Sequence, residues 1–374
     1  AAGLDRYRDA IVSRLEAMGA ATTSHAGPSK PDWLLGGAAG DPPPTVVCES
    51  EAIRDAGDAV RLLIAGHLDT VFDPAGEFRE MVVQPDGKTA IGPGVVDMKG
   101  GILIAVVALE ALHAAEQRVA WSFLLNSDEE TGSFYSHAHL EQAARAHDVG
   151  IALEPALPGG ALAVQRKGSG QFAIETFGRS AHAGREFEKG VSAVYALARA
   201  LTEVEKMSDL ERGVTVNVGP LRGGIATNAV PDHAIAWGNA RYPDPQAADE
   251  LGAKLDALAT SADAMPRVVV HRAFNRPAKP MTPPVERLGM FVRDAAEGIG
   301  QSLPFESTGG VCDGNILQSV GLPTVDTLGV RGGGLHTTDE WIELDSLVER
   351  AQLLAVTLLR LSESPRDLWR EERA

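Results

Sequence analysis

Apolar residues in the first part of the chain gather into short runs that alternate with longer stretches of helical spacing. Runs at 62–65, 119–125 and 149–153 predict buried strands. The stretch 4–18 places apolar residues on one helical face, and the strongly apolar stretch 102–115 after a glycine-rich turn predicts a second helix. Strands that alternate with helices predict an α/β fold, with a mostly parallel sheet and helices on its faces.

The pattern changes near residue 166. Residues 171–176 alternate as a half-buried strand, and the following stretches predict helix 191–206, strands 214–218 and 229–240, helix 247–259 and strand 267–271. This βαββαβ order is ferredoxin-like. The first pattern resumes after Pro280, so we expect a domain of residues 166–279 inserted into a discontinuous domain of 1–165 and 280–374. The stretch 22–44, rich in Gly, Pro and Ala, is expected to be irregular.

Composition narrows the class of protein. The chain has 374 residues, 44% of them hydrophobic, enough for two globular domains. A net charge of −17 argues against a nucleic-acid partner. No apolar run approaches the roughly 20 residues of a membrane helix, so no membrane partner is expected. Two cysteines, Cys48 and Cys312, imply no disulfide framework. The first residues do not resemble a signal peptide. We expect a cytoplasmic protein, and a periplasmic or secreted one stays open because a leader can be missing.

Candidate metal ligands follow the predicted strands or lie in glycine-rich turns. They are His67, Asp97, Glu129, Glu130, Glu154 and His336. The carboxyl ends of strands in an open α/β sheet are where ligands bind. Two histidines and three carboxylates suit a pair of Zn²⁺ ions, one carboxylate can bridge both, and a further acidic residue can act as general base. Asp69 lies two residues after His67 and points to the same side, where it can orient that imidazole.

Each stretch has a plainer explanation when taken alone. Glu129 and Glu130 could begin a helix, Asp97 could cap one, and His336 could be a turn residue. The prediction of a metal site therefore depends on all of them occurring in order within one α/β pattern.

Six motifs resemble those of the M20 family of metallopeptidases, with a pattern closest to the glutamate carboxypeptidases of the carboxypeptidase G2 type. The motifs are residues 66–71 (GHLDTV), 92–101 (GPGVVDMKGG), 126–133 (NSDEETGS), 153–155 (LEP), 178–184 (GRSAHAG) and 334–337 (GLHT). The resemblance covers nearly the whole chain, and the motifs together are highly specific.

The resemblance implies a role for each candidate. His67, Asp97 and Glu154 would hold one zinc ion, and Asp97, Glu130 and His336 would hold the other. Glu129 would be the general base, and Asp69 would orient His67. Co²⁺ or Mn²⁺ are alternatives to the two zinc ions.

The resemblance also implies that the inserted domain forms a homodimer and contributes His182 to the partner's active site. Asn228 and Arg241 match segments that bind the substrate carboxylate and the developing oxyanion. An arginine can clamp a carboxylate through two hydrogen bonds. Lys167 and Arg276 are further basic candidates for substrate binding.

Two places depart from the family pattern. Met98 stands where an acidic residue usually follows the bridging Asp, and Val311 and Cys312 occupy the glycine-rich substrate loop at 308–314. We expect Cys312 to be a small buried residue rather than a nucleophile. These departures concern specificity and leave the predicted ligands intact.

We therefore expect a di-zinc metallohydrolase that cleaves an amide bond and releases a C-terminal amino acid from a small peptide or N-acyl amino acid. An N-acyl-amino-acid deacylase or a dipeptidase of the same family is the nearest alternative. A non-catalytic peptide-binding protein is a more remote one, since it need not keep Glu129 and a full ligand set. A purely structural zinc site is disfavoured because such sites are mostly built from Cys and His.

Overall fold

The computed structural model describes residues 2–35 and 42–369, which form two compact units. One unit contains residues 2–29, 42–166 and 280–369, and the other contains 30–35 and 167–279. The sequence places 30–35 in the larger domain, whereas the structure groups it with the smaller unit. The reason is Trp33, whose ring stacks on His271 at 5.7 Å and whose carbonyl accepts a hydrogen bond from the Trp237 indole. Predictions for residues 1, 36–41 and 370–374 lie outside the described residues.

The larger unit contains a six-stranded sheet with helices on both faces. Its helices are α1 (Ala2–Glu16), α2 (Glu51–Arg54), α3 (Gly100–Ala114), α4 (His137–Ala146), α7 (Pro283–Gly298), α8 (Asp313–Ser319) and α9 (Leu344–Ser362). Its strands are β1 (Ala21–His25), β2 (Thr45–Glu49), β3 (Leu62–His67), β4 (Val82–Val83), β5 (Thr89–Ile91), β6 (Trp121–Asn126), β7 (Val149–Ala152), β8 (Leu162–Arg166), β15 (Phe305–Thr308), β16 (Thr324–Val325), β17 (Gly332–Gly333) and β18 (Trp341–Glu343).

The main sheet has the strand order β1-β2-β6-β3-β7-β16. The pairs β6–β3, β3–β7 and β7–β16 are parallel, and β1–β2 and β2–β6 are antiparallel. This mixed, mostly parallel sheet confirms the predicted α/β fold. Because β6, β3 and β7 run in the same direction, their carboxyl ends meet at one edge of the sheet.

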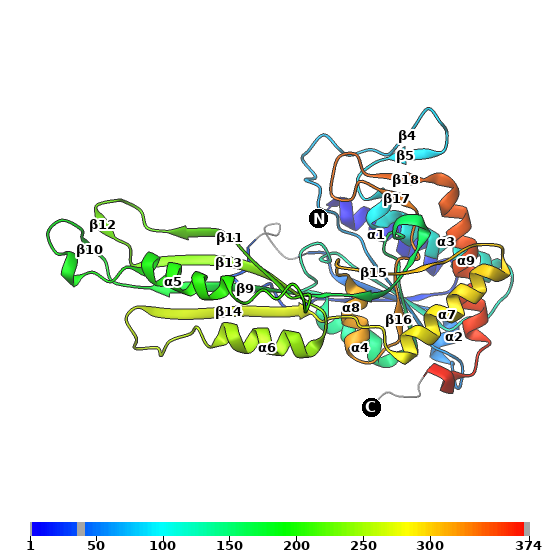
Figure 1. Cartoon of the computed structure of the whole chain (residues 1–374). Helices are drawn as coiled ribbons and strands as arrows, with labels where there is room; N and C mark the ends of the chain where they lie inside the picture. The colour runs from blue at the N-terminus through cyan, green and yellow to red at the C-terminus, as the bar shows by residue number, and fades with distance from the viewer. Residues whose placement is uncertain (1, 36–41, 370–374) are drawn as a thin grey trace. The chain divides into compact units, whose positions relative to one another are not determined.

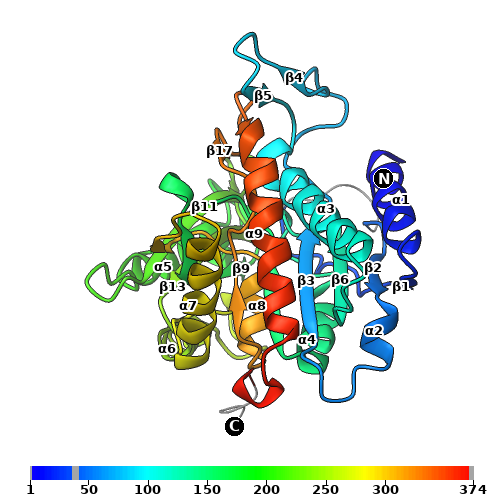
Figure 2. The same ribbon diagram turned by 90° about the vertical axis from the view of Figure 1, so that its right-hand side faces the viewer.

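Strand β3 shows how the sheet is buried on both faces. Leu62 and Ile64 join a large core with α3, α7 and α9, while Leu63 and Ala65 pack with residues of α4 and α8 on the opposite face. Figure 2 shows α3, α7 and α9 on the near side of these strands. Burying each such aliphatic side chain contributes roughly 1.5–3 kcal/mol, so the strand that leads to His67 is firmly held.

The smaller unit is a four-stranded antiparallel sheet packed on two helices. Its elements are β9 (Gly168–Phe177), β10 (Ala181–His182), α5 (Ala193–Glu205), β11 (Thr215–Gly223), β12 (Ala229–Val230), β13 (His233–Tyr242), α6 (Pro245–Asp256) and β14 (Arg267–Arg276). The strand order β11-β13-β9-β14 and the βαββαβ succession give the predicted ferredoxin-like topology (Figure 1).

Both helices of the smaller unit begin at side-chain caps. The Ser192 hydroxyl accepts a hydrogen bond from the Tyr195 N–H at 3.2 Å, and the Asp244 carboxylate accepts one from Ala247 at 2.8 Å. Leu197 and Val204 of α5 then pack with apolar residues of α6 and of the sheet. One face of this sheet is thus covered by helices.

Two local predictions are wrong. The predicted irregular stretch 22–44 contains most of β1, whose residues Thr22 and Thr23 pair with β2 in an antiparallel ladder. The predicted strand 229–240 is divided into β12 and β13 around Pro231, which lacks the N–H that a central strand needs. As the sequence predicts, no helix within residues 2–35 and 42–369 is long and apolar enough to span a membrane.

Candidate metal centre

His67 is the last residue of β3 and is 1% exposed. Its Nδ1 lies 3.0 Å from the Asp69 carbonyl oxygen and 3.4 Å from the Asp69 carboxylate. A carbonyl can only accept, so Nδ1 carries a proton and Nε2 is the nitrogen that could bind a metal ion. Nε2 lies 3.1 Å from Asp97 Oδ1. The strand end therefore directs Nε2 of His67 toward Asp97.

Asp97 lies in the turn Val95–Lys99, which precedes α3. The Glu340 carboxylate accepts hydrogen bonds from the N–H groups of Gly94, Val96 and Asp97 at 2.9–3.1 Å. At Gly101 a Cβ would collide with the Leu153 carbonyl, so only glycine allows α3 to begin this close to β7. These contacts fix Asp97 beside the residues that follow β7.

Glu129 and Glu130 lie in the turn that follows β6. Their backbone N–H groups donate to the Asp69 carboxylate at 3.3 and 3.0 Å. Asp69 therefore contacts His67 through its carbonyl and holds the turn with its carboxylate. This second contact is additional to the orienting role that the sequence predicts for Asp69.

Glu154 and His336 complete the set from two other segments. Glu154 follows β7 and is 8% exposed, and its carbonyl accepts the Gly329 N–H at 2.9 Å. His336 lies in a tight turn at a left-handed φ of 63° and is the most exposed member of the set. Its Nε2 lies 3.5 Å from Asp97 Oδ2 and 3.5 Å from Glu130 Oε2.

These residues form two groups that share Asp97. His67, Asp97 and Glu154 offer ligand atoms within 4.8 Å of one another, and so do Asp97, Glu130 and His336. Oδ1 of Asp97 faces His67, and Oδ2 faces His336. We call these five residues the acidic cluster. The donor set of imidazole nitrogens and carboxylate oxygens fits two divalent ions with one bridging carboxylate.

The electrostatics of the acidic cluster favour a bound cation. Burial raises the pKa of Glu130 to about 8. Burial and the charge of Asp97 raise the pKa of Glu154 well above its usual range. Burial also acts against ionised Asp97, but hydrogen bonds with His336 and His67 bring the pKa of Asp97 below its usual value. Buried carboxylates that oppose each other's ionisation become good ligands when a divalent cation compensates their charge.

The predicted site residues of the smaller unit lie at two ends of its sheet. His182 and Asn228 lie near the paired strands β10 and β12, where the Ala183 N–H donates to the Asn228 carbonyl at 2.9 Å. The Gly184 N–H donates to His182 Nδ1 at 3.1 Å, so the proton of the neutral imidazole is on Nε2. The exposed His182 can therefore act as a donor through Nε2.

Arg241 and Arg276 lie at the other end, on either side of Ser169 in the sheet. Arg241 Nη1 is buried without a hydrogen-bond partner among the described residues, and burial lowers the pKa of Arg241. Arg276 is 3% exposed. Lys167 donates from Nζ to the Gly213 carbonyl at 2.7 Å. A buried guanidinium N–H is suited to an anionic ligand.

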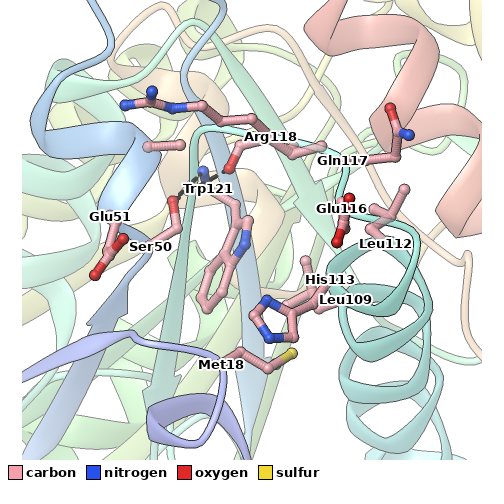
Figure 3. Close-up of a pocket in the computed structure, with 12 residues that line it drawn as sticks. Met18, Ser50, Glu51, Leu109, Leu112, His113, Glu116, Gln117, Arg118 and Trp121 are labelled. Carbon is pink, nitrogen blue, oxygen red and sulfur yellow. Dashed lines mark hydrogen bonds between the residues drawn. The ribbon is translucent and has the colours of Figure 1, made fainter.

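A separate cavity of about 280 Å³ opens at the opposite edge of the main sheet. It is lined by the start of β6 and by residues at the ends of helices, including Trp121, His113 and Glu116 (Figure 3). The Ser50 hydroxyl donates to the Val119 carbonyl and accepts the Trp121 N–H, which closes one wall. None of the residues that line it is a predicted site residue, so this cavity and the acidic cluster occupy different edges of the sheet.

One residue near the acidic cluster, Glu340, was not predicted, whereas Met98 and Cys312 were singled out as departures from the family pattern. Glu340 comes from a segment more than 240 positions away from the turn that it holds. Met98, the departure from the family pattern, is buried and its Sδ accepts the His67 N–H at 3.2 Å. Cys312 is fully buried, as predicted, and burial raises the pKa of its thiol. Glu340 follows His336 by four residues, which is the only local signal that could have pointed to it.

The chain belongs to peptidase family M20/M25/M40, whose model matches residues 63–360. This confirms the predicted family and places the protein among hydrolytic metalloenzymes. Carboxypeptidase G2 from Pseudomonas sp. (strain RS-16) is 26% identical over 312 residues, which are 80% of this chain and 74% of that protein. A succinyl-diaminopimelate desuccinylase from Methylorubrum extorquens (strain PA1) is 30% identical over 316 residues, 76% of this chain and 79% of that protein.

Solved structures share the fold. A tripeptidase from Staphylococcus aureus superimposes with a TM-score of 0.72 at 23% identity, covering 94% of this chain and 91% of the other. A dinuclear metal-binding peptidase of the M20 family from Bacillus subtilis superimposes with a TM-score of 0.65 at 15% identity, covering 95% and 91%. The acidic cluster is thus a candidate dinuclear metal site on an M20 fold.

Proposed function

We propose that the protein is a di-zinc amide hydrolase that releases a C-terminal amino acid from a small peptide or an N-acyl amino acid. The observation that carries this proposal is the pair of ligand groups sharing Asp97, with Glu129 outside both groups and directly before the ligand Glu130 in the same turn. A set of ligands alone would serve binding, whereas an additional carboxylate beside it provides a general base.

Zinc fits the acidic cluster best, because two imidazoles and three carboxylates match its preference for nitrogen and oxygen ligands. Co²⁺ or Mn²⁺ accept the same donors. Two bound ions would polarise the scissile carbonyl and lower the pKa of water.

Residues of the chain itself would carry out the proton transfers and hold the reacting groups in place. Glu129 takes the proton of the attacking water and returns it to the leaving amine. Burial is the main cause of the raised pKa of Glu130 and of Glu154, and the charge of the Glu129 carboxylate adds to the rise in both. Asp69 holds the backbone of Glu129 and fixes the tautomer of His67. Both contacts keep the base and one ligand in a single arrangement before substrate arrives.

Arg241 is assigned to the substrate carboxylate, with Asn228 and the basic residues Lys167 and Arg276 as further candidates. His182 is assigned to the oxyanion of a second subunit in a homodimer. His233, next to the His182 end, and Arg241 are eight positions apart along β13, which corresponds to roughly 26 Å at about 3.3 Å per residue. One small substrate cannot contact both ends of one sheet, and this supports action of His182 in the partner's site.

The names of the relatives are compatible with two classes of substrate. One is named a carboxypeptidase and another a desuccinylase, so a peptide or an N-acyl amino acid could be the substrate. An N-acyl-amino-acid deacylase or dipeptidase is therefore the second candidate function. A binding-only protein is disfavoured by the presence of Glu129 beside a full ligand set.

The test is a panel of peptidyl and N-acyl amino acids incubated with the zinc-loaded protein, with released amino acid as the readout. Glu129→Gln should retain two metal ions and lose about 10²–10⁴-fold in kcat, the usual contribution of a general base. Glu116→Gln, which changes a carboxylate in the cavity of Figure 3, is the matched control and should keep wild-type activity. Near-wild-type turnover by Glu129→Gln would refute the assignment of the base.

A further inference from the structure

The turn that carries Glu129 and Glu130 is held by a carboxylate from a distant part of the same unit. Asp313, the first residue of α8, is 3% exposed. Its Oδ1 accepts a hydrogen bond from the Ser133 hydroxyl at 2.6 Å, and its Oδ2 accepts one from the Asn126 amide at 2.6 Å. These two donors lie on either side of Glu129 and Glu130 in the sequence.

Both contacts have the features of strong, directional hydrogen bonds. Asn126 and Ser133 are fully buried, so water does not compete for them. At 2.6 Å the contact from the Ser133 hydroxyl has the length of a hydroxyl–carboxylate hydrogen bond. Asp313 therefore joins the end of β6 to the far side of the turn.

The rest of the turn is fixed from within and from β3. The Asp128 carbonyl accepts the Ser133 N–H at 2.7 Å, and the Asp128 carboxylate accepts the Tyr135 N–H at 2.6 Å. The Asp69 carboxylate holds the N–H groups of Glu129 and Glu130. Asp313 is the member of this arrangement that comes from the segment 308–314, which the sequence marks as a glycine-rich loop.

We propose that Asp313 is a positioning residue for the general base: it holds residues 126–133 in one conformation and thereby fixes the Glu129 carboxylate relative to the acidic cluster. The inference rests on the proposed function of Glu129. It assigns Asp313 no contact with substrate, and its effect passes through Asn126 and Ser133. A displacement of about 1 Å of a catalytic group can cost 10²-fold in rate, so a residue of this kind can matter without touching the reacting atoms.

The variants Asp313→Ala and Asp313→Asn separate positioning from folding. Alanine removes both acceptors, whereas asparagine keeps one acceptor for Asn126 and can still face the Ser133 hydroxyl. We expect kcat to fall about 100-fold for Asp313→Ala and about tenfold for Asp313→Asn, with KM within threefold of wild type and two metal ions retained. Ser133→Ala should show part of the same loss of kcat. The double variant Asp313→Ala/Ser133→Ala should lose less than the two single losses combined, because both changes break the same contact.

The matched control is Asp148, another buried carboxylate, which accepts hydrogen bonds from the Arg61 N–H and from Arg366 near the amino end of β7. Asp148→Asn should change kcat less than twofold. The second readout is amide hydrogen exchange of the metal-free protein, in which Asp313→Ala should accelerate exchange in residues 127–136 and Asp148→Asn should not.

Three results would overturn the inference: unchanged exchange in residues 127–136 of Asp313→Ala, an equal loss of kcat in Asp148→Asn, or a rise in KM at constant kcat. The exchange measurement does not depend on turnover. If wild type hydrolysed none of the amides, the proposed function would fail, while accelerated exchange would still show that Asp313 holds this turn.

Discussion

Two places in the chain put one carboxylate between two histidines, and they differ in what surrounds the carboxylate. In the acidic cluster, Asp97 lies between His67 and His336. In the smaller unit, Glu175 of β9 lies between His233 of β13 and His271 of β14, with Nε2–Oε distances of 2.8 and 2.9 Å. We call the second set the strand cluster.

The surroundings decide what each cluster can do. The acidic cluster adds the carboxylates of Glu130 and Glu154, and His67, Asp97 and Glu154 are buried. In the strand cluster each oxygen of Glu175 has its own histidine, and the side chains are 23–49% exposed. A histidine–carboxylate pair is thus common to both, and only additional buried carboxylates create a need for a cation. The comparison predicts that metal binding requires the acidic cluster and does not depend on the strand cluster.

The largest effect is expected for Asp97→Asn. Asp97 belongs to both ligand groups, so its loss should reduce bound metal from the proposed two ions to fewer than one per chain and lower activity by at least about 10³-fold. Glu175→Gln makes the corresponding change in the strand cluster and should leave metal content and kcat unchanged. Metal analysis of the dialysed proteins checks both. Full metal occupancy in Asp97→Asn would remove the distinction between the clusters.

A smaller effect is expected for His182. Its Nε2–H is available as a donor because Nδ1 accepts the Gly184 N–H. Loss of an oxyanion donor typically costs 10²–10³-fold in kcat, and we expect this range for His182→Ala. Mixing His182→Ala with Glu129→Gln should restore activity if each chain supplies what the other lacks. Absence of recovery, with subunit exchange demonstrated separately, would argue against action between subunits.

Arg241→Ala should reduce kcat/KM by about tenfold or more, since charge-assisted hydrogen bonds contribute about 1.5–3 kcal/mol and 1.4 kcal/mol is one decade. Arg241→Lys should recover only part, because it keeps the charge and loses the planar fork. Substrates with an amidated carboxyl terminus provide the control: Arg241→Ala should hardly affect them. If Arg241→Ala lowered kcat/KM equally for free-acid and amidated substrates, Arg241 would have a structural role and would not bind the substrate carboxylate.

The sequence predicted the parts of the molecule that are encoded locally. The apolar run before His67, the glycines around Asp97 and the ferredoxin-like succession are all short-range patterns, and the structure contains the corresponding elements. The five residues of the acidic cluster could be named because each belongs to a compact motif, and the structure brings their side chains together.

The residues that support the cluster escaped prediction because their partners are remote in sequence. Glu340 holds the backbone of Asp97 and Asp313 holds Ser133, at separations of 243 and 180 positions. Nothing in the sequence near either acid indicates which groups it will contact. The same reason applies to Trp33, which packs on His271 of the smaller unit. Strand β1 was not predicted because most of its residues are polar. It forms through backbone pairing with β2, which a hydrophobic pattern does not reveal.

The smallest predicted effect concerns stability at the strand cluster. Burial acts to raise the pKa of Glu175, but hydrogen bonds from His233 and His271 lower it on balance. A lowered folded-state pKa contributes stability that is present above the ordinary pKa of Glu, about 4.3, and is lost as pH falls through the folded value. Glu175→Gln should therefore reduce the free energy of unfolding at pH 7 by less than about 1 kcal/mol, since the group is partly exposed and screened by solvent. The gap from wild type should close as the pH is lowered below about 4.3, and Glu211→Gln, at an exposed position, controls for the loss of one charge. Denaturant titrations at several pH values measure the gap. A gap that widens toward low pH would mean that the bridged carboxylate destabilises the sheet, and the contrast with the acidic cluster would then rest on burial alone.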